Sequence, residues 1–289
     1  MNAALRNLLA AALLAWVSCA WAADVPQHAQ GLDERLVSVE LAPGVRQEGV
    51  LSQKDGATAP THLAVLLPGN PSVVRPQVEG RSMVASRLTG NFLIRARRHL
   101  AGTGVATLVV DCRTDQGDLC SGEYQASRQR HEDVARLIAA ARAQLPSIKH
   151  VWLVGTSLGT ISSAFMPTHA SAGEFAGVLH TAAITDPYRG QNARSLVRFD
   201  YRRVGIAQAF VHHMDDPCVA TPYQRAESIA REAGVTLVSV TGAKGVRGDP
   251  CQAQTQHGFV GVERAVMTEL RRMMTEGVGS SRTLAVEPD

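Results

Sequence analysis

Short, mostly apolar runs without Asp, Glu, Lys or Arg recur along the chain. They cover residues 62–67, 105–110, 151–154, 175–179, 206–211 and 235–240. Runs of this length and polarity are typical of strands buried on both faces of a sheet. The pattern therefore predicts a central sheet whose strands are spread over most of the chain.

Between these runs, apolar residues return with helical spacing. In 125–145 they lie at Val134, Leu137, Ile138 and Ala141, and Pro146 ends the segment. Further helices are expected over 91–100, 157–165, 222–233 and 259–274. Strands that alternate with helices form a mostly parallel sheet with helices on both faces, so the predicted fold class is α/β.

The N-terminal part has a different pattern. Leu36–Leu41 alternates apolar and polar residues, Pro43-Gly44 is a turn signal, and Arg46–Leu51 predicts a second strand. We expect an antiparallel hairpin at one edge of the sheet. Residues 72–90 have no clear period and predict a long loop, and the polar segment 275–289 predicts a disordered tail.

The first 22 residues have the features of a secretory signal peptide. Arg6 supplies the positive start, Leu8–Val17 is an apolar stretch of about ten residues, and Ala20-Trp21-Ala22 is a small-x-small cleavage site. Cleavage after Ala22 would leave one domain over 23–274, in the periplasm or outside the cell. No later stretch reaches the length of a membrane span, so no membrane association is expected after cleavage.

Cysteine usage agrees with export. Loss of the leader removes Cys19, unless that residue is lipidated in a lipoprotein, and leaves four cysteines. An even number in an exported chain predicts two disulfides, with four buried free thiols as the alternative. Of the three possible connectivities we expect Cys112–Cys120, which closes a short loop after a strand, and Cys218–Cys251, which joins two loops.

The charge balance argues against two classes of partner. The chain has 29 basic and 26 acidic residues, a formal net charge of +3, and only 4% aromatic residues. So small an excess favours neither nucleic acid nor a membrane surface. Few aromatic residues also leave little surface for stacking bases or sugars.

The segment Gly155-Thr156-Ser157-Leu158-Gly159 carries the strongest chemical signal. An apolar run leads into this Gly-x-Ser-x-Gly pattern, and a helical stretch follows it, which predicts a nucleophile elbow. There a sharp turn lifts the Ser157 hydroxyl above the end of the sheet, and the two glycines leave room for neighbouring backbone. N–H groups of Leu158 and of Gly69 or Asn70 are the expected oxyanion donors.

Candidates for the other catalytic groups follow later strands. A serine hydroxyl is a weak nucleophile until an imidazole takes its proton, and the imidazole needs a carboxylate to orient it. We expect Ser157, Asp216 and His257 to form this triad, since this is the chain order of one class of serine hydrolases. Asp215 and Asp186 remain alternative acids.

On these motifs the chain resembles small secreted α/β-hydrolases, including dienelactone-hydrolase-like proteins and other serine esterases. The resemblance covers about Leu36–Met274, and Leu67-Pro68 stands where the family has His-Gly before its oxyanion turn. It implies an α/β-hydrolase fold, an acyl-enzyme on Ser157, a small-molecule acyl substrate and no cofactor. The short stretch 180–206 leaves no room for a large cap. A peptidase or amidase, and a noncatalytic binding protein, are the alternative functions.

Other polar residues are weaker candidates. Arg113 and His180 could contact substrate, but an ion pair of Arg113 with Asp115 or Asp118, and core packing of His180, are equally open. His212 and His213 are adjacent on a strand and point to opposite faces, so no metal site is expected there. The basic run 95–99 predicts a solvated helix face.

Overall fold

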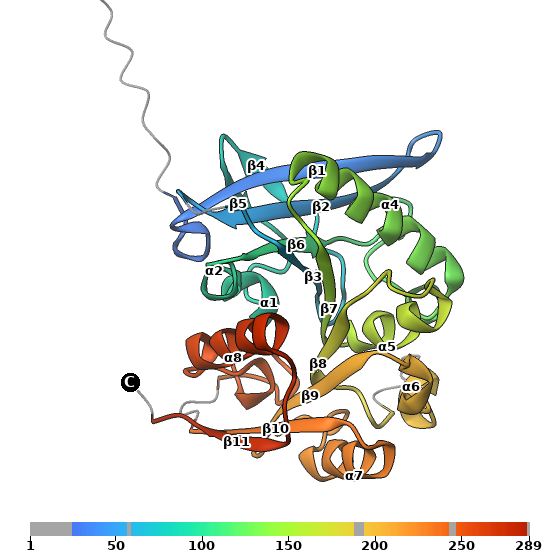
Figure 1. Cartoon of the computed structure of the whole chain (residues 1–289), viewed down its shortest axis with the longest axis vertical. Helices are drawn as coiled ribbons and strands as arrows, with labels where there is room; N and C mark the ends of the chain where they lie inside the picture. The colour runs from blue at the N-terminus through green and yellow to red at the C-terminus, as the bar shows by residue number, and fades with distance from the viewer. Residues whose placement is uncertain (1–24, 57–58, 188–193, 243–246, 288–289) are drawn as a thin grey trace, which may run out of the picture.

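One twisted sheet runs through the described part of the chain and carries helices on both faces (Figure 1). The computed structural model describes residues 25–56, 59–187, 194–242 and 247–287. The predicted signal peptide, 1–22, lies outside these residues, as does Cys19. Within them the main sheet has the strand order β1-β2-β6-β3-β7-β8-β9-β10-β11.

The strands are β1 (Leu32–Ala42), β2 (Val45–Lys54), β3 (His62–Leu67), β4 (Gln77–Glu79), β5 (Ser82–Ala85), β6 (Val105–Val110), β7 (His150–Ser157), β8 (Gly177–Ala183), β9 (Ala207–His213), β10 (Thr236–Thr241) and β11 (Arg282–Ala285). The helices are α1 (Phe92–Arg95), α2 (Arg97–Leu100), α3 (Gly122–Gln125), α4 (Arg128–Gln144), α5 (Thr160–His169), α6 (Arg194–Val197), α7 (Tyr223–Ala233) and α8 (Glu263–Glu276). Three 3₁₀ turns, η1 (Gln27–Ala29), η2 (Tyr201–Val204) and η3 (Gln256–Gly258), complete the described elements.

The pairing confirms the predicted mostly parallel sheet with an antiparallel edge. β1 pairs with β2 and β2 with β6 in antiparallel fashion. From β6 onward the neighbouring strands are parallel. Because the parallel strands point the same way, their carboxyl ends meet along one edge, and the loops that leave them lie together there.

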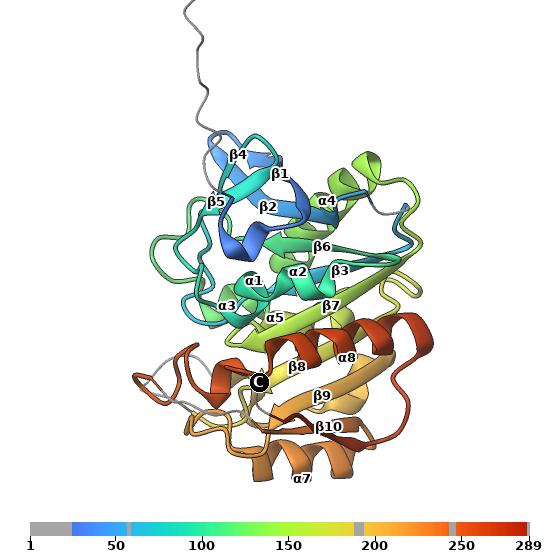
Figure 2. The ribbon, with the colours of Figure 1, turned by 90° about the vertical axis from the view of Figure 1, so that its left-hand side faces the viewer.

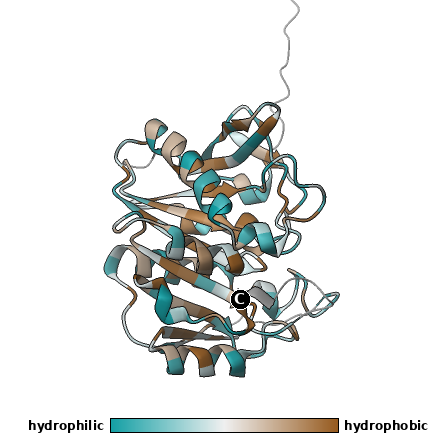
Figure 3. Ribbon diagram, turned by 90° about the vertical axis from the view of Figure 1, so that its right-hand side faces the viewer, coloured by the Kyte–Doolittle hydropathy of each residue, from teal (hydrophilic) through white to brown (hydrophobic). Residues whose placement is uncertain are grey.

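Alternate side chains of the buried strands divide between two hydrophobic layers. In β3, Ala64 and Leu66 pack with α1, α2 and α8, whereas Leu63, Val65 and Leu67 pack with α4. Figure 2 shows α1, α2 and α8 on the near face of the sheet, and Figure 3 shows the sheet from the opposite side. Both faces of the central strands are thus covered, as their lack of polar alternation requires.

Two segments have more structure than the sequence suggests. The expected loop 72–90 contains the small antiparallel sheet β4-β5. The expected disordered tail 275–289 instead contains the end of α8 and strand β11, which pairs with β10. Leu284 packs against the core and Arg282 pairs with Glu269, and these tertiary contacts order a segment whose composition is polar.

The basic run 95–99 is not a solvated face. It forms two short helical turns that meet at Ala96. Arg97 is fully buried, and its guanidinium donates to both carboxylate oxygens of Glu34 at 2.8 Å. Arg95 is half-buried and pairs with Glu263 at 2.9 Å. Ion pairs of Arg95 and Arg97 therefore connect α1 to α8 and α2 to β1.

Candidate active site

Ser157 ends β7 in a conformation that non-glycine residues rarely adopt. Its φ is +51°, and the N–H of Gly159 closes the turn by donating to the Thr156 carbonyl at 2.9 Å. A Cβ on Gly159 would overlap the Leu67 carbonyl oxygen, and one on Gly155 would overlap the Ser163 hydroxyl. The two glycines are thus required by close packing, as the elbow pattern predicts.

The structure brings Ser157, His257 and Asp216 into one hydrogen-bonded series. The Ser157 Oγ lies 3.0 Å from His257 Nε2, and His257 Nδ1 lies 3.1 Å from an Asp216 carboxylate oxygen. Ser157 follows β7, Asp216 follows β9, and His257 lies in η3, on the long connection after β10. Distances of this kind allow an imidazole to take a hydroxyl proton and a carboxylate to hold the ring.

The Asp216 carboxylate is buried but well supplied with donors. The Cys218 N–H donates to one oxygen at 2.9 Å, and the Thr221 hydroxyl donates to the other at 2.8 Å. His212 Nε2 lies 3.4 Å from that second oxygen. Burial alone raises the pKa of Asp216, but hydrogen bonds from His212 and His257 and their charges outweigh it and hold this pKa well below its usual range.

The two alternative acids lie elsewhere. Asp215 is exposed, and its backbone N–H donates to His213 Nδ1 at 3.0 Å. The Asp186 carboxylate accepts from the Thr185 hydroxyl at 2.9 Å. Of the three acids considered, Asp216 is therefore the one whose carboxylate contacts His257. His212 and His213 are successive residues of β9, and side chains alternate between the two faces of a strand, so the two rings point to opposite faces of the sheet.

Both disulfides pair as expected from the sequence. Cys112 is bonded to Cys120, and Cys218 to Cys251, with Cα separations of 5.7 and 4.5 Å. The second bond joins the loop that carries Asp216 to the loop that leads to His257. The disulfide therefore holds these two loops together next to the hydrogen bond between Asp216 and His257.

The expected oxyanion turn follows β3 and lies against the serine. A Cβ on Gly69 would lie 3.0 Å from Ser157 Cβ. In the described part of the chain, the N–H groups of Leu158, Gly69 and Asn70 find no acceptor. Leu67-Pro68 precedes this turn, which keeps the backbone of Gly69 beside Ser157. These free donors suit an oxyanion.

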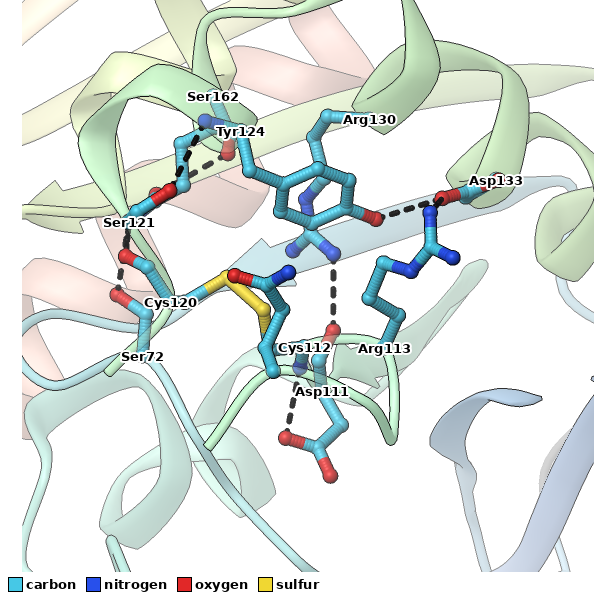
Figure 4. The surroundings of a disulfide bond; sticks show 12 residues. Ser72, Asp111, Cys112, Arg113, Cys120, Ser121, Tyr124, Arg130, Asp133 and Ser162 are labelled. Carbon is cyan, nitrogen blue, oxygen red and sulfur yellow. Dashed lines mark hydrogen bonds and ion pairs between the residues drawn. A yellow bond between two sulfur atoms is a disulfide. The ribbon is translucent and has the colours of Figure 1, made fainter. Parts of the chain in front are cut away.

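Hydrogen bonds to buried polar groups hold the turn that follows β3. Ser72 donates through its N–H to the Gly69 carbonyl at 2.7 Å. The Asp111 carboxylate, at the end of β6, accepts the N–H groups of Val74 and Arg75 at 2.6 and 3.0 Å. Beside the Cys112–Cys120 disulfide (Figure 4), the Cys120 N–H donates to the Pro71 carbonyl at 2.9 Å. The turn is therefore anchored to β6 and to the disulfide loop.

A cleft of about 220 Å³ opens at Ser157. Its walls come from the oxyanion turn, the start of α1 and the loop before η3. They include Gly69, Asn70, Arg87, Leu88, Gly90, Asn91, Phe92, Gln252 and Ala253. Most of these side chains are small or polar, so the cleft suits a compact acyl group.

The structure does not bring Arg113 or His180 to this cleft. Arg113 pairs with Asp115 at 2.6 Å, and its guanidinium lies beside Asp133 and Tyr124 (Figure 4). His180 is fully buried beside Tyr201 and bonds to Ser163 at 2.9 Å. Burial lowers the pKa of His180 to about 3, so the ring is neutral. Its position is that of a core histidine.

Sequence reasoning missed three residues around the site. Thr221 contacts both Asp216 and His257, the latter at 3.1 Å. Arg95 donates to the Gly258 carbonyl at 2.6 Å, directly after His257. Asn91 caps α1 and lines the cleft. A helix cap before the apolar stretch Phe92-Leu93-Ile94 is a readable signal for Asn91, but no local pattern marks the other two.

Two further observations concern ligands and membranes. Among residues 25–56, 59–187, 194–242 and 247–287, no three His, Cys, Asp or Glu side chains gather closely enough to hold a metal ion. None of the helices in those ranges combines the length and apolarity needed to cross a bilayer.

Neither a protein-family model nor a curated protein sequence matches the chain. Solved structures do. A cold-adapted esterase from an Arctic intertidal metagenomic library superposes with a TM-score of 0.52 at 16% identity, covering 85% of this chain and 96% of that one. The acylaminoacyl peptidase of Pyrococcus horikoshii gives a TM-score of 0.55 at 13% identity, covering 86% of this chain and 42% of that one.

An acylaminoacyl peptidase in complex with a chloromethyl ketone gives a TM-score of 0.51 at 13% identity, covering 90% of this chain and 43% of that one. Identities this low carry information on the fold alone. The sheet order, the antiparallel N-terminal edge and the strand–turn–helix at Ser157 agree with these likenesses. The chain therefore has the α/β-hydrolase fold.

Proposed function

We propose that the chain is an exported serine hydrolase that cleaves an ester or related acyl bond of a small molecule, without a cofactor. The Ser157 Oγ attacks the acyl carbon while His257 takes the hydroxyl proton and passes it to the leaving group. Water, activated by the same imidazole, then hydrolyses the acyl-enzyme. The observation that carries this proposal is the hydrogen-bonded series Ser157–His257–Asp216 at the carboxyl edge of the sheet.

The surroundings of the series support the proposal. Backbone N–H groups of Leu158 and of Gly69 or Asn70 would stabilise negative charge on the acyl oxygen. The cleft of about 220 Å³ suits a modest acyl group. Two disulfides support export, because such bonds form and persist in oxidising compartments.

Covalent labelling with a fluorophosphonate tests the nucleophile. We expect the wild-type chain to be labelled on Ser157 and the Ser157→Ala variant to lose both label and ester turnover, the latter by roughly 10⁴–10⁶-fold. Ser38→Ala, at an exposed serine of β1, is the control and keeps both. Labelling at another serine would contradict the assignment, and a chain that takes no label and hydrolyses no ester would favour the noncatalytic alternative.

A substrate panel separates esterase from peptidase. The panel pairs p-nitrophenyl esters with p-nitroanilides of the same acyl groups and with N-acetylated peptides. We expect the esters of short acyl groups to give the highest kcat/KM. Faster release of N-acetylated residues from peptides would favour the peptidase alternative. We include this alternative because the fold resembles that of acylaminoacyl peptidases.

A further inference from the structure

A second cavity lies away from Ser157, between α2, the first turns of α8 and β11. We call it the α2–α8 groove, and its volume is about 870 Å³. It shares no lining residue with the cleft at Ser157. We propose that this groove binds a small amphipathic organic anion, with a carboxylate held by Arg98 and Arg264 and an apolar chain against β11.

The carboxylates that line the groove are already neutralised. Glu263 pairs with Arg95 at 2.9 Å. Glu269 pairs with Arg272 at 3.0 Å and also contacts Arg282. Neither acid is therefore left over to balance further positive charge in the groove.

The remaining cations of the groove have no such partner. Within the described ranges, neither Arg98 nor Arg264 forms an ion pair with a carboxylate. Arg98 is nevertheless held in place by uncharged acceptors, because its Nη1 donates to the Gln27 carbonyl at 2.7 Å and its Nε donates to His99 Nε2 at 3.3 Å. The fold therefore orients this guanidinium without pairing it with a carboxylate of the described residues.

Arg98 and Arg264 both act on the same imidazole. Burial lowers the pKa of His99, and the charges of Arg98 and Arg264 lower it further, against a smaller opposing effect of Glu263. Arg98, Arg264 and His99 line the same groove. Like charges gathered along one groove repel one another, and a bound anion would reduce that repulsion.

The rest of the groove is suited to an apolar chain. Its wall includes Ala96, Val262, Ala265, Leu284 and Val286. Leu284 and Val286 also pack on the core, so this wall is fixed in position. The volume is within the range of small-molecule sites, and a carboxylate can accept paired hydrogen bonds from an arginine fork. An uncharged ligand would leave the positive charges of both guanidiniums without a counter-charge.

Calorimetric titration of the full chain with octanoate tests the proposal. We expect one octanoate per chain, and affinity at least about 10-fold weaker for octanol, which lacks the charge, and for the double variant Arg98→Gln/Arg264→Gln. The matched control is Arg128→Gln/Arg225→Gln, which removes two exposed arginines from α4 and α7 and should bind as wild type.

A second variant adds charge instead of removing it. Ala265→Glu places a carboxylate on the wall of the groove at a helical position that tolerates Glu, and should also weaken octanoate binding at least about 10-fold. Fluorophosphonate treatment separates this site from the cleft. Binding that persists on the labelled enzyme supports the groove whether or not ester hydrolysis is found. Loss of octanoate binding on labelling, or equally tight binding of octanoate to the arginine double variant and to wild type, would overturn the proposal.

Discussion

Ser157 illustrates how neighbours can impose an unfavourable conformation on a single residue. A positive φ at a non-glycine position costs on the order of 1–3 kcal/mol. Here the Thr160 hydroxyl donates to the Ser157 carbonyl at 2.5 Å, and Gly159 packs against β3. The strained turn is therefore held from both sides, with the hydroxyl directed toward His257.

Removal of the Asp216 charge tests the role of this residue. In Asp216→Asn the imidazole loses the partner that holds its tautomer and stabilises its charged form, so ester turnover should fall on the order of 10⁴-fold. Asp215→Asn and Asp186→Asn should keep turnover near wild type. Steady-state kinetics on a p-nitrophenyl ester measures all three, and an equal loss in Asp186→Asn would move the acid to the loop after β8.

Asp216 should also make stability depend on pH. Its pKa is lower in the folded state than in the unfolded chain, so the stabilisation is fully present above the unfolded value of about 4 and is lost as the pH falls through the folded value. The difference in free energy of unfolding between wild type and Asp216→Asn should therefore shrink from pH 5 to pH 2. Urea denaturation across this range measures it, and a constant difference would contradict the prediction.

At the scale of elements, no residue of 214–222 or 247–258, in the loops after β9 and β10, belongs to the three large hydrophobic clusters of the core. The Cys218–Cys251 bond closes 33 residues and should contribute about 3–4 kcal/mol in the chain-entropy model. Its larger effect should be on geometry, because small misplacements of catalytic groups cost rate.

The double variant Cys218→Ser/Cys251→Ser tests this mechanical role. We expect it to stay folded at 25 °C, by circular dichroism, while kcat for an ester falls by about 10–100-fold. Peptide mapping without reductant should find Cys218 joined to Cys251 in the wild-type chain. Full activity in the folded double variant would show that the two loops hold their positions without the bond.

The buried pair Glu34–Arg97 joins β1 to α2, and Glu34 also accepts from Met83 of β5 at 2.7 Å. Glu34→Gln leaves a buried guanidinium uncompensated and should lower the free energy of unfolding by about 3–5 kcal/mol. Glu40→Gln, at an exposed position of the same strand, should change it by less than about 0.5 kcal/mol. Chemical denaturation compares them, and equal effects would show that the pair adds nothing.

At the scale of the whole molecule, four loops from one edge of the sheet converge on Ser157. They leave β3, β7, β9 and β10, which are spread from Leu67 to Thr241 in the chain. The site can therefore form only once the parallel sheet is in place, since no single segment holds more than one member of the series.

The proposed export is tested on the whole chain. If residues 1–22 are a signal peptide, the exported protein should begin at Ala23 and carry no free thiol, because cleavage would remove Cys19 and the other four cysteines are paired. Intact-mass analysis before and after thiol alkylation measures both. A diacylglyceryl group on Cys19, or alkylated cysteines, would contradict this prediction.

Local patterns were enough to predict the α/β class, the hairpin edge, the strand–turn–helix at Ser157 and the Cys112–Cys120 disulfide. The Cys218–Cys251 pairing followed from the expected meeting of two loops at one edge of the sheet. Buried strands, turn residues and close-packed glycines leave signatures within a few neighbouring positions, so they can be read before folding is known. The contacts of Thr221 and Arg95 and the ordering of β11 could not be predicted in this way. They depend on which residues the folded sheet brings together over tens to hundreds of positions, and on how deeply each is buried. Arg97 and Arg98 are neighbours in one basic run, yet tertiary packing buries Arg97 in an ion pair with Glu34 and places Arg98 on the wall of a groove.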